Sequence, residues 1–129
     1  MAKLTIRDIH QKMEEIKVIG KEGLFLWGAV KSITGTAFLS KKNPMHGISY
    51  KNGYIYILPF SHEKIFTQSM VRISITNIKN VTMEKEALSF GRRKTLTFNL
   101  KDGSSFSMSV QSIYLKQMQI LTLINAKLN

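Results

Sequence analysis

The chain contains no cysteine, which excludes disulfides, thiolate metal sites and cysteine nucleophiles. This absence also fits the reducing cytoplasm, which is the location we expect. The most membrane-like run, Gly23–Val30, has eight residues and ends at Lys31, whereas a spanning helix needs about 20. The first residues lack the apolar segment of a secretory signal. We therefore expect a soluble protein.

Recognised catalytic signatures are also missing. The sequence has no GxGxxG, GxxxxGK or GxSxG motif. His10, His46 and His62 fall in different predicted elements without a metal-ligand spacing, and Glu84 and Glu86 have no histidine or second acid beside them in the sequence. The sequence therefore predicts no enzyme activity, no cofactor and no metal.

Acidic side chains are scarce. Lys and Arg number 19 against 8 Asp and Glu, and the formal net charge is +11. Residues 1–22 carry five basic and four acidic side chains, so nearly all of the excess lies in residues 23–129. A basic surface favours anionic partners such as phospholipid headgroups, nucleic acid or acidic proteins. A generally cationic surface that aids solubility is the alternative.

Strict alternation of apolar and polar residues marks Thr95–Val110 as an antiparallel hairpin with one buried face. A two-residue Asp-Gly turn would place Phe98 opposite Ser107. A three-residue loop, Lys101 to Gly103 with Gly103 left-handed, instead pairs Phe98 with Phe106 and so keeps apolar side chains on one face. We predict the three-residue loop.

A second hairpin is predicted over Gly47–Phe60. Asn52-Gly53 suits a type I′ turn because both positions need positive φ. This turn pairs Tyr50 with Ile55 and Ile48 with Ile57. Tyr54, Tyr56 and Leu58 occupy the other face, so we expect the strand to be covered on both sides. Pro59 predicts its end or an edge position.

Three further strands complete the predicted sheet, and a long loop separates the first of them from the hairpins. Leu24–Val30 is continuously apolar and predicts a buried strand, with Trp27 in the core. Val71–Ser74 and Lys79–Glu84 predict two short strands. The longest irregular stretch is Ile33–His46, in which Thr36–Leu39 could form a short strand; it also carries adjacent lysines, Lys41 and Lys42.

Helices are predicted at both ends. Thr5–Lys17 places Ile6, Ile9, Met13 and Ile16 on one stripe, and Thr5 with Asp8 matches a capping box. This helix packs either on its own domain or on a partner. From Ser112 the period changes to about 3.6, which predicts an amphipathic C-terminal helix. Leu115 and Leu123 fall off its apolar stripe and are candidates for a self-association surface.

The predicted fold class is mainly β (α+β): seven antiparallel strands forming a barrel or sandwich, capped by a C-terminal amphipathic helix, with an extra N-terminal helix. In this order of elements residues 24–128 resemble the pleckstrin-homology-like (PH-like) superfamily, especially its small bacterial and GRAM-related domains. The resemblance rests on GISYKNGYIYILPF, RISITNIKNVTMEK and KTLTFNLKDGSSFSMSV, followed by the terminal helix. It divides the chain into an N-terminal helix with its connector, 1–22, and a PH-like domain, 23–129.

The PH-like resemblance implies a binding or scaffolding module that engages an anionic phospholipid surface or a protein partner, peripheral to the inner face of the membrane. In lipid-binding members basic residues lie in the loop after the first strand and on nearby strands. The corresponding residues here are Lys31, Lys41, Lys42 and Lys51.

The densest basic cluster in the sequence is Arg92-Arg93-Lys94, which could present two guanidinium groups to phosphate oxygens. A solvated turn before a strand is the alternative. Nucleic-acid binding is a rival function, with Tyr50, Tyr54, Tyr56 and Phe60 as stacking platforms. A self-assembling adaptor without an anionic ligand is a third interpretation.

Overall fold

The computed structural model describes residues 3–21, 23, 25–35, 45–87, 92–111 and 125. The elements within these ranges follow the chain as α1 (Ile6–Glu15), β1 (Phe25–Thr34), β2 (Met45–Lys51), β3 (Tyr54–Phe60), η1 (Thr67–Ser69), β4 (Val71–Ser74), η2 (Ile75–Asn77), β5 (Ile78–Lys85), β6 (Arg93–Leu100) and β7 (Ser105–Gln111). The predicted short strand 36–39 and, apart from Asn125, the predicted helix 112–128 lie outside the described residues.

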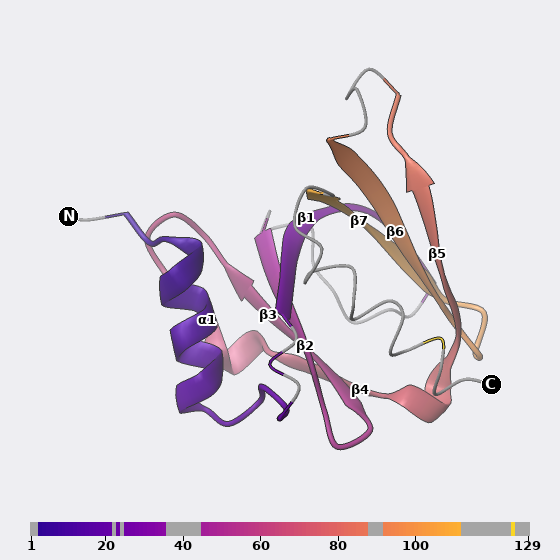
Figure 1. The fold of residues 1–129 in the computed structure, drawn as a ribbon. Coiled ribbons are helices and arrows are strands. Elements are labelled where there is room, and N and C mark those ends of the chain that lie inside the picture. Colours follow the sequence, from indigo (N-terminus) through magenta and orange to yellow (C-terminus); the bar gives the residue numbers. More distant parts are fainter. Residues whose placement is uncertain are drawn as a thin grey trace.

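The seven strands form one antiparallel sheet in the order β4-β3-β2-β1-β7-β6-β5. The first and last strands of the chain thus meet at the centre of the sheet, whereas β4 and β5 are its edges. Figure 1 shows β2, β3 and β4 on the side of α1, with β5, β6 and β7 curving away from it. The predicted seven-stranded antiparallel architecture is confirmed.

Both predicted hairpin turns are confirmed. Gly103 has φ +90°, and β6 and β7 pair Phe98 with Phe106 and Leu96 with Met108. Asn52 and Gly53 have φ values of +50° and +84°, and β2 and β3 pair in the predicted register. In each hairpin the turn that keeps apolar residues on a common face is the one adopted.

The concave face of the sheet holds the main core. Alternate side chains of β6 and β7 are buried there, and the rings of Phe98 and Phe106 stack with centroids 4.7 Å apart. Leu26 from β1 and Ile48 from β2 join the same cluster. The intervening positions of β6, such as Thr97, are only half-buried and face outward.

A second apolar cluster joins α1 to the outer face of β1–β3. Ile9 and Met13 are fully buried and pack with Leu58 and Phe60 of β3. The helix begins with the predicted capping box, in which the Asp8 carboxylate accepts from the Thr5 backbone N–H at 2.8 Å. This hydrogen bond lowers the pKa of Asp8. The N-terminal helix therefore packs on the sheet of its own chain.

The structure corrects two expectations for the segment between Phe25 and Phe60 and decides a third between its alternatives. The irregular stretch predicted at Ile33–His46 is too long, because β1 extends through Thr34 by pairing with β7, and β2 already begins at Met45. Pro59 does not end β3, but it takes the predicted edge position: it pairs with His46 of β2 and lies beyond the residues of β3 that pair with β4. Trp27 is half-buried and stacks with Phe25 at 5.9 Å rather than lying in the core.

His46 lies in β2 and is fully buried. Neither ring nitrogen has a hydrogen-bond partner among the residues that the structure describes. Removal from water disfavours the imidazolium, so burial lowers the pKa of His46 from 6.5 to about 4. His46 is consequently a neutral core residue at physiological pH.

Replacing His46 with leucine should make the protein less sensitive to acid. Between pH 6.5 and about 4 the unfolded chain binds a proton at His46 that the folded chain does not, so the wild-type protein loses stability as the pH falls through this window. The slope is about 1.4 kcal/mol per pH unit and the total loss is about 3 kcal/mol. Denaturant unfolding at pH 7 and pH 4 measures this loss, which His46→Leu should abolish.

The exposed His62 provides the matched control, since His62→Gln should retain the wild-type pH dependence. An equal loss of stability in wild type and His46→Leu would contradict the assignment.

Candidate anion-binding surface

Two lysines face each other at one end of the β5–β6 hairpin. Lys85 is the last residue of β5 and pairs directly with Lys94 of β6. Like charges directly opposite each other on neighbouring strands destabilise a hairpin. Neither lysine has an acidic partner among the described residues. An anion placed against this pair would relieve the repulsion between them.

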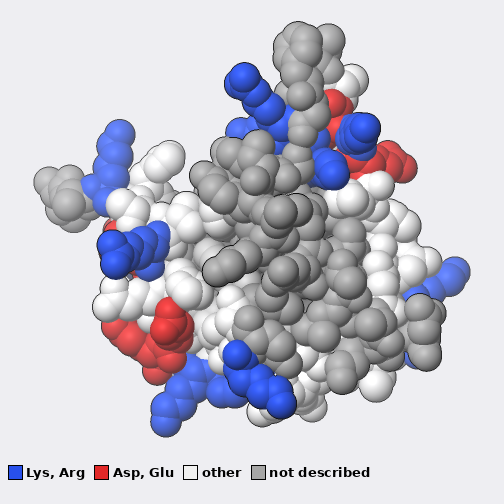
Figure 2. All heavy atoms as spheres, in the orientation of Figure 1, with Lys and Arg blue, Asp and Glu red and all other residues white. Residues whose placement is uncertain are grey.

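Two arginines extend the same cluster. Arg92 and Arg93 are exposed and immediately precede Lys94. Figure 2 shows Lys and Arg side chains gathered at the top of the molecule, above the end of this hairpin, with acidic side chains beside them. Within the predicted Arg92-Arg93-Lys94 cluster, the two arginines are exposed and Lys94 is half-buried.

The same end of the hairpin exposes a methionine. Met83 pairs with Leu96 and is 40% exposed, whereas Leu96 is buried. Because strand residues two apart share a face, Met83 and Lys85 lie on one face of β5. We call Met83, Lys85, Arg92, Arg93 and Lys94 the hairpin tip. The tip combines cations with an apolar side chain.

Glu86 connects the hairpin tip to the centre of the sheet. Its side chain is 18% exposed; one carboxylate oxygen accepts from the Ser109 hydroxyl at 2.6 Å, and the other lies 3.6 Å from Lys31 Nζ. Lys31 Nζ also donates to the Thr95 hydroxyl at 3.2 Å. The bond from Ser109, with Lys31 and Arg93 nearby, holds the pKa of Glu86 below its usual value. The Glu86 carboxylate therefore balances part of the positive charge of Lys31 and Arg93 within the protein.

A β-bulge brings Lys31 to Glu86. Along β1, Val30 pairs with Met108 and Ser32 with Ser107, so Lys31 is an extra residue with no partner position on β7. A bulge of this kind re-aims a side chain. The structure thereby brings Lys31 and Arg93, two candidates that lie far apart in the sequence, near the same carboxylate of Glu86.

Of the remaining predicted site residues, the structure describes Lys51, which does not join the hairpin tip. Lys51 lies at the end of β2, and its Nζ donates to the Lys17 carbonyl at 2.8 Å, where the chain leaves α1. Lys41, Lys42, Leu115 and Leu123 lie outside the described residues. Lys85 and Met83 were not predicted as site residues, because only the β5–β6 register places them beside Lys94 and Leu96. A prediction of that register would have identified the pair of facing lysines.

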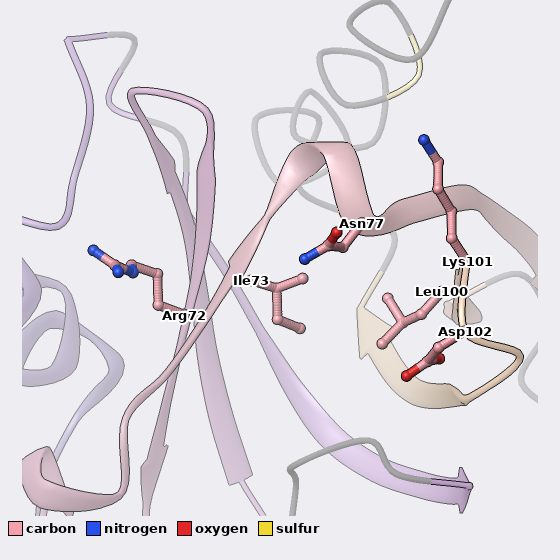
Figure 3. A pocket seen from close by; sticks show the side chains of 6 residues that line it. All are labelled: Arg72, Ile73, Asn77, Leu100, Lys101 and Asp102. Atoms are coloured by element: carbon pink, nitrogen blue, oxygen red, sulfur yellow. The ribbon is translucent and has the colours of Figure 1, made fainter.

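A cavity of about 330 Å³ opens where the two sheet edges diverge. Figure 3 shows Ile73 of β4 and Leu100 of β6 turned toward the same space, with Asn77 above them. Lys101 and Arg72 extend away from that space, and the Arg72 guanidinium stacks over the Tyr54 ring at 4.5 Å. The cavity is thus an apolar recess with cations at its border.

In the part of the chain that the structure describes, no cluster of His, Asp or Glu could hold a metal ion. Among those same residues, no helix is long and apolar enough to cross a membrane.

Among solved structures, the chain is similar to the pleckstrin homology domain of USP37. The similarity has a TM-score of 0.51 at 17% sequence identity and covers 81% of this chain and 96% of that domain. The fold is PH-like. No protein-family profile and no curated protein matches the sequence. At this identity the similarity establishes the fold and does not identify a ligand.

We expect removal of the Glu86 carboxylate to loosen the PH-like sheet at the hairpin tip. Glu86→Ala removes the acceptor of the Ser109 hydroxyl and the ion-pair partner of Lys31, and it should lower the free energy of unfolding by about 1–2 kcal/mol at pH 7. Because the pKa of Glu86 is depressed, its contribution is present above the pKa of the unfolded chain and is lost as the pH falls through the folded pKa. Denaturant titrations at pH 7 and pH 3 should therefore show a smaller difference at pH 3.

Glu84→Ala is the matched control, since the exposed Glu84 has no hydrogen bond or ion pair to a described residue. It should change stability by less than about 0.5 kcal/mol. Equal effects of the two substitutions would rule out the proposed role of Glu86.

Proposed function

We propose that the chain is a non-enzymatic PH-like binding module that docks its hairpin tip onto an anionic membrane surface. The observation that carries this proposal is the direct opposition of Lys85 and Lys94. Two facing lysines weaken the hairpin in isolation. Bound phosphate groups would attract both lysines and so offset the repulsion between them. The narrower GRAM-related and bacterial assignment rests on the sequence patterns alone.

The charge of the hairpin tip is of the right size for reversible binding. A lysine or arginine close to an anionic membrane contributes about 1 kcal/mol. Lys85, Arg92, Arg93 and Lys94 would together supply at most roughly 4 kcal/mol, which corresponds to about millimolar affinity, and the exposed Glu84 beside Lys85 would weaken this attraction. Glu86 subtracts little from this attraction because Lys31 already neutralises it.

Met83 supports a membrane rather than a purely polar ligand. Its exposed side chain lies on the same face of β5 as Lys85. When the lysines contact headgroups, the methionine can bury apolar surface at the boundary of the acyl chains. A cationic cluster flanked by an apolar residue is typical of peripheral attachment.

The nucleic-acid alternative loses much of its predicted stacking surface. Tyr50 and Phe60 are buried, at 7% and 6% exposure. Arg72 already covers the Tyr54 ring. Tyr56 is half-buried and packs with the α1 cluster. Of the four aromatic residues proposed as platforms, two are therefore buried, and the other two are half-buried and already in contact with Arg72 or with the α1 cluster.

Co-sedimentation with vesicles tests the proposal. Neutral phosphatidylcholine vesicles are compared with vesicles that also contain phosphatidylserine, at low and physiological salt, with and without an oligonucleotide competitor. We expect binding to anionic vesicles only, weakening with salt because the contacts are exposed. Displacement by the oligonucleotide would favour nucleic acid, and absence of binding would favour a protein partner or a self-assembling adaptor.

Charge reversal at the hairpin tip should abolish vesicle binding. Lys85→Glu/Lys94→Glu removes two attractive charges and adds two repulsive ones, so affinity for anionic vesicles should fall at least about 30-fold. The hairpin should remain folded, because both positions lie at its end, where Lys85 is exposed and Lys94 is half-buried.

The matched control is Lys3→Glu/Arg7→Glu, which changes the net charge equally at exposed positions around the start of α1. It should bind vesicles within about twofold of wild type, allowing for the long-range effect of net charge. Equal losses in the two variants would show that net charge, rather than the hairpin tip, attracts the membrane and would overturn the proposal.

A further inference from the structure

The β5–β6 hairpin carries a second pair of lysines at its other end. Ile78 of β5 pairs with Leu100 of β6, and each is followed by a lysine, Lys79 and Lys101. Both side chains are exposed. We call Lys79 and Lys101 the far end of the hairpin. It lies beside η2 and the β6–β7 turn, away from the hairpin tip (Figure 1).

The local backbone fixes the position of each lysine at the far end. Lys79 is an extra residue at a β-bulge, because Ile78 and Asn80 pair with the adjacent Leu100 and Asn99. The Lys101 backbone N–H donates to the Asn77 carbonyl at 2.9 Å, which ties the β6–β7 turn to η2. The backbone of the fold therefore determines where the two lysines of the far end lie.

The charges at the far end are incompletely balanced. Asp102 lies next to Lys101, but its Oδ1 accepts from the Ser104 backbone N–H at 2.8 Å and from the Ser104 hydroxyl at 2.5 Å. Figure 3 shows the Lys101 side chain directed away from Asp102 and from the apolar recess. Within the described ranges, neither Lys79 nor Lys101 forms an ion pair.

The two ends of the hairpin are electrostatically independent. Six residues separate Lys79 from Lys85, which at about 3.3 Å per residue is roughly 20 Å. This separation exceeds the Debye length of about 8 Å at physiological ionic strength. The positions between the two lysines on β5 are uncharged up to Glu84. A membrane bound at the hairpin tip would thus leave the far end directed away from that membrane. The charges of Lys79 and Lys101 would remain available to another anionic surface.

We propose that the far end is a second docking surface for an anionic membrane, so that one copy of the chain bridges two bilayers. This inference rests on the proposed docking of the hairpin tip to the first bilayer. The shared chemistry is attraction of exposed lysines to anionic headgroups. Opposite ends of one hairpin suit contact with two surfaces, because a bilayer that meets the tip of an upright hairpin leaves the far end free to meet another.

Vesicle clustering separates bridging from simple binding. Phosphatidylcholine vesicles containing phosphatidylserine are mixed with the full chain; co-sedimentation reports binding, and dynamic light scattering reports the size of vesicle assemblies. Wild type should bind and cluster vesicles. Lys79→Glu/Lys101→Glu should bind within about twofold of wild type but reduce clustering at least tenfold. Lys79→Gln/Lys101→Gln should reduce clustering in the same direction and guards against misfolding of the reversed variant.

Lys3→Glu/Arg7→Glu is the matched control for net charge and should retain both binding and clustering. A lysine at an edge-strand bulge can also block edge-to-edge pairing. A glutamate would preserve that protection, so loss of clustering in the reversed variant reports on the charge sign.

Several results would overturn the inference. Equal loss of clustering in the far-end variant and the control would attribute clustering to net charge. Reduced binding by the far-end variant would indicate that the hairpin lies flat on one bilayer. Binding by wild type without clustering, or clustering that the far-end substitutions leave unchanged, would exclude bridging through this surface. Failure of wild type to bind anionic vesicles would instead reject the proposed function itself.

Discussion

The architecture depends on the close approach of β1 to β7. β1 pairs with β2 on one side and β7 on the other, and so joins the first four strands to the last three. At their contact, a Cβ added to Gly28 would lie 2.3 Å from the Ser109 carbonyl oxygen. Real Cβ atoms do not approach an oxygen so closely, so this position requires glycine. Without it the two halves of the sheet could not share one concave core.

The hairpin tip depends on the same junction. Ser109, whose backbone packs against Gly28, also donates its hydroxyl to Glu86, and the bulge on β1 brings Lys31 to the other carboxylate oxygen. The end of an edge hairpin is thereby fastened to the centre of the sheet. A surface that presents like charges together needs such support, because repulsion between Lys85 and Lys94 opposes the pairing that places them.

Local signals were sufficient for much of the fold. The Asn52-Gly53 turn, the loop closed by Gly103 and the capping box of Thr5 and Asp8 each depend on residues close together in the sequence, and each was predicted in detail. Long-range pairing was not predictable in this way. The extension of β1 to Thr34 depends on β7, about 70 residues away, and the half-exposure of Trp27 depends on its place on the outer face.

The sequence by itself determined that strands alternate between a buried and an exposed face, that α1 has an apolar stripe, and that positive charge dominates. These properties follow from side-chain periodicity and turn chemistry, which act over a few residues. Only the tertiary structure decided which cations lie together: Lys31 near Glu86, Lys85 opposite Lys94, and Lys51 at a different place beside the exit of α1. The physical reason is that strand register and a one-residue bulge determine where a charge points, and both are fixed by the burial of the whole core.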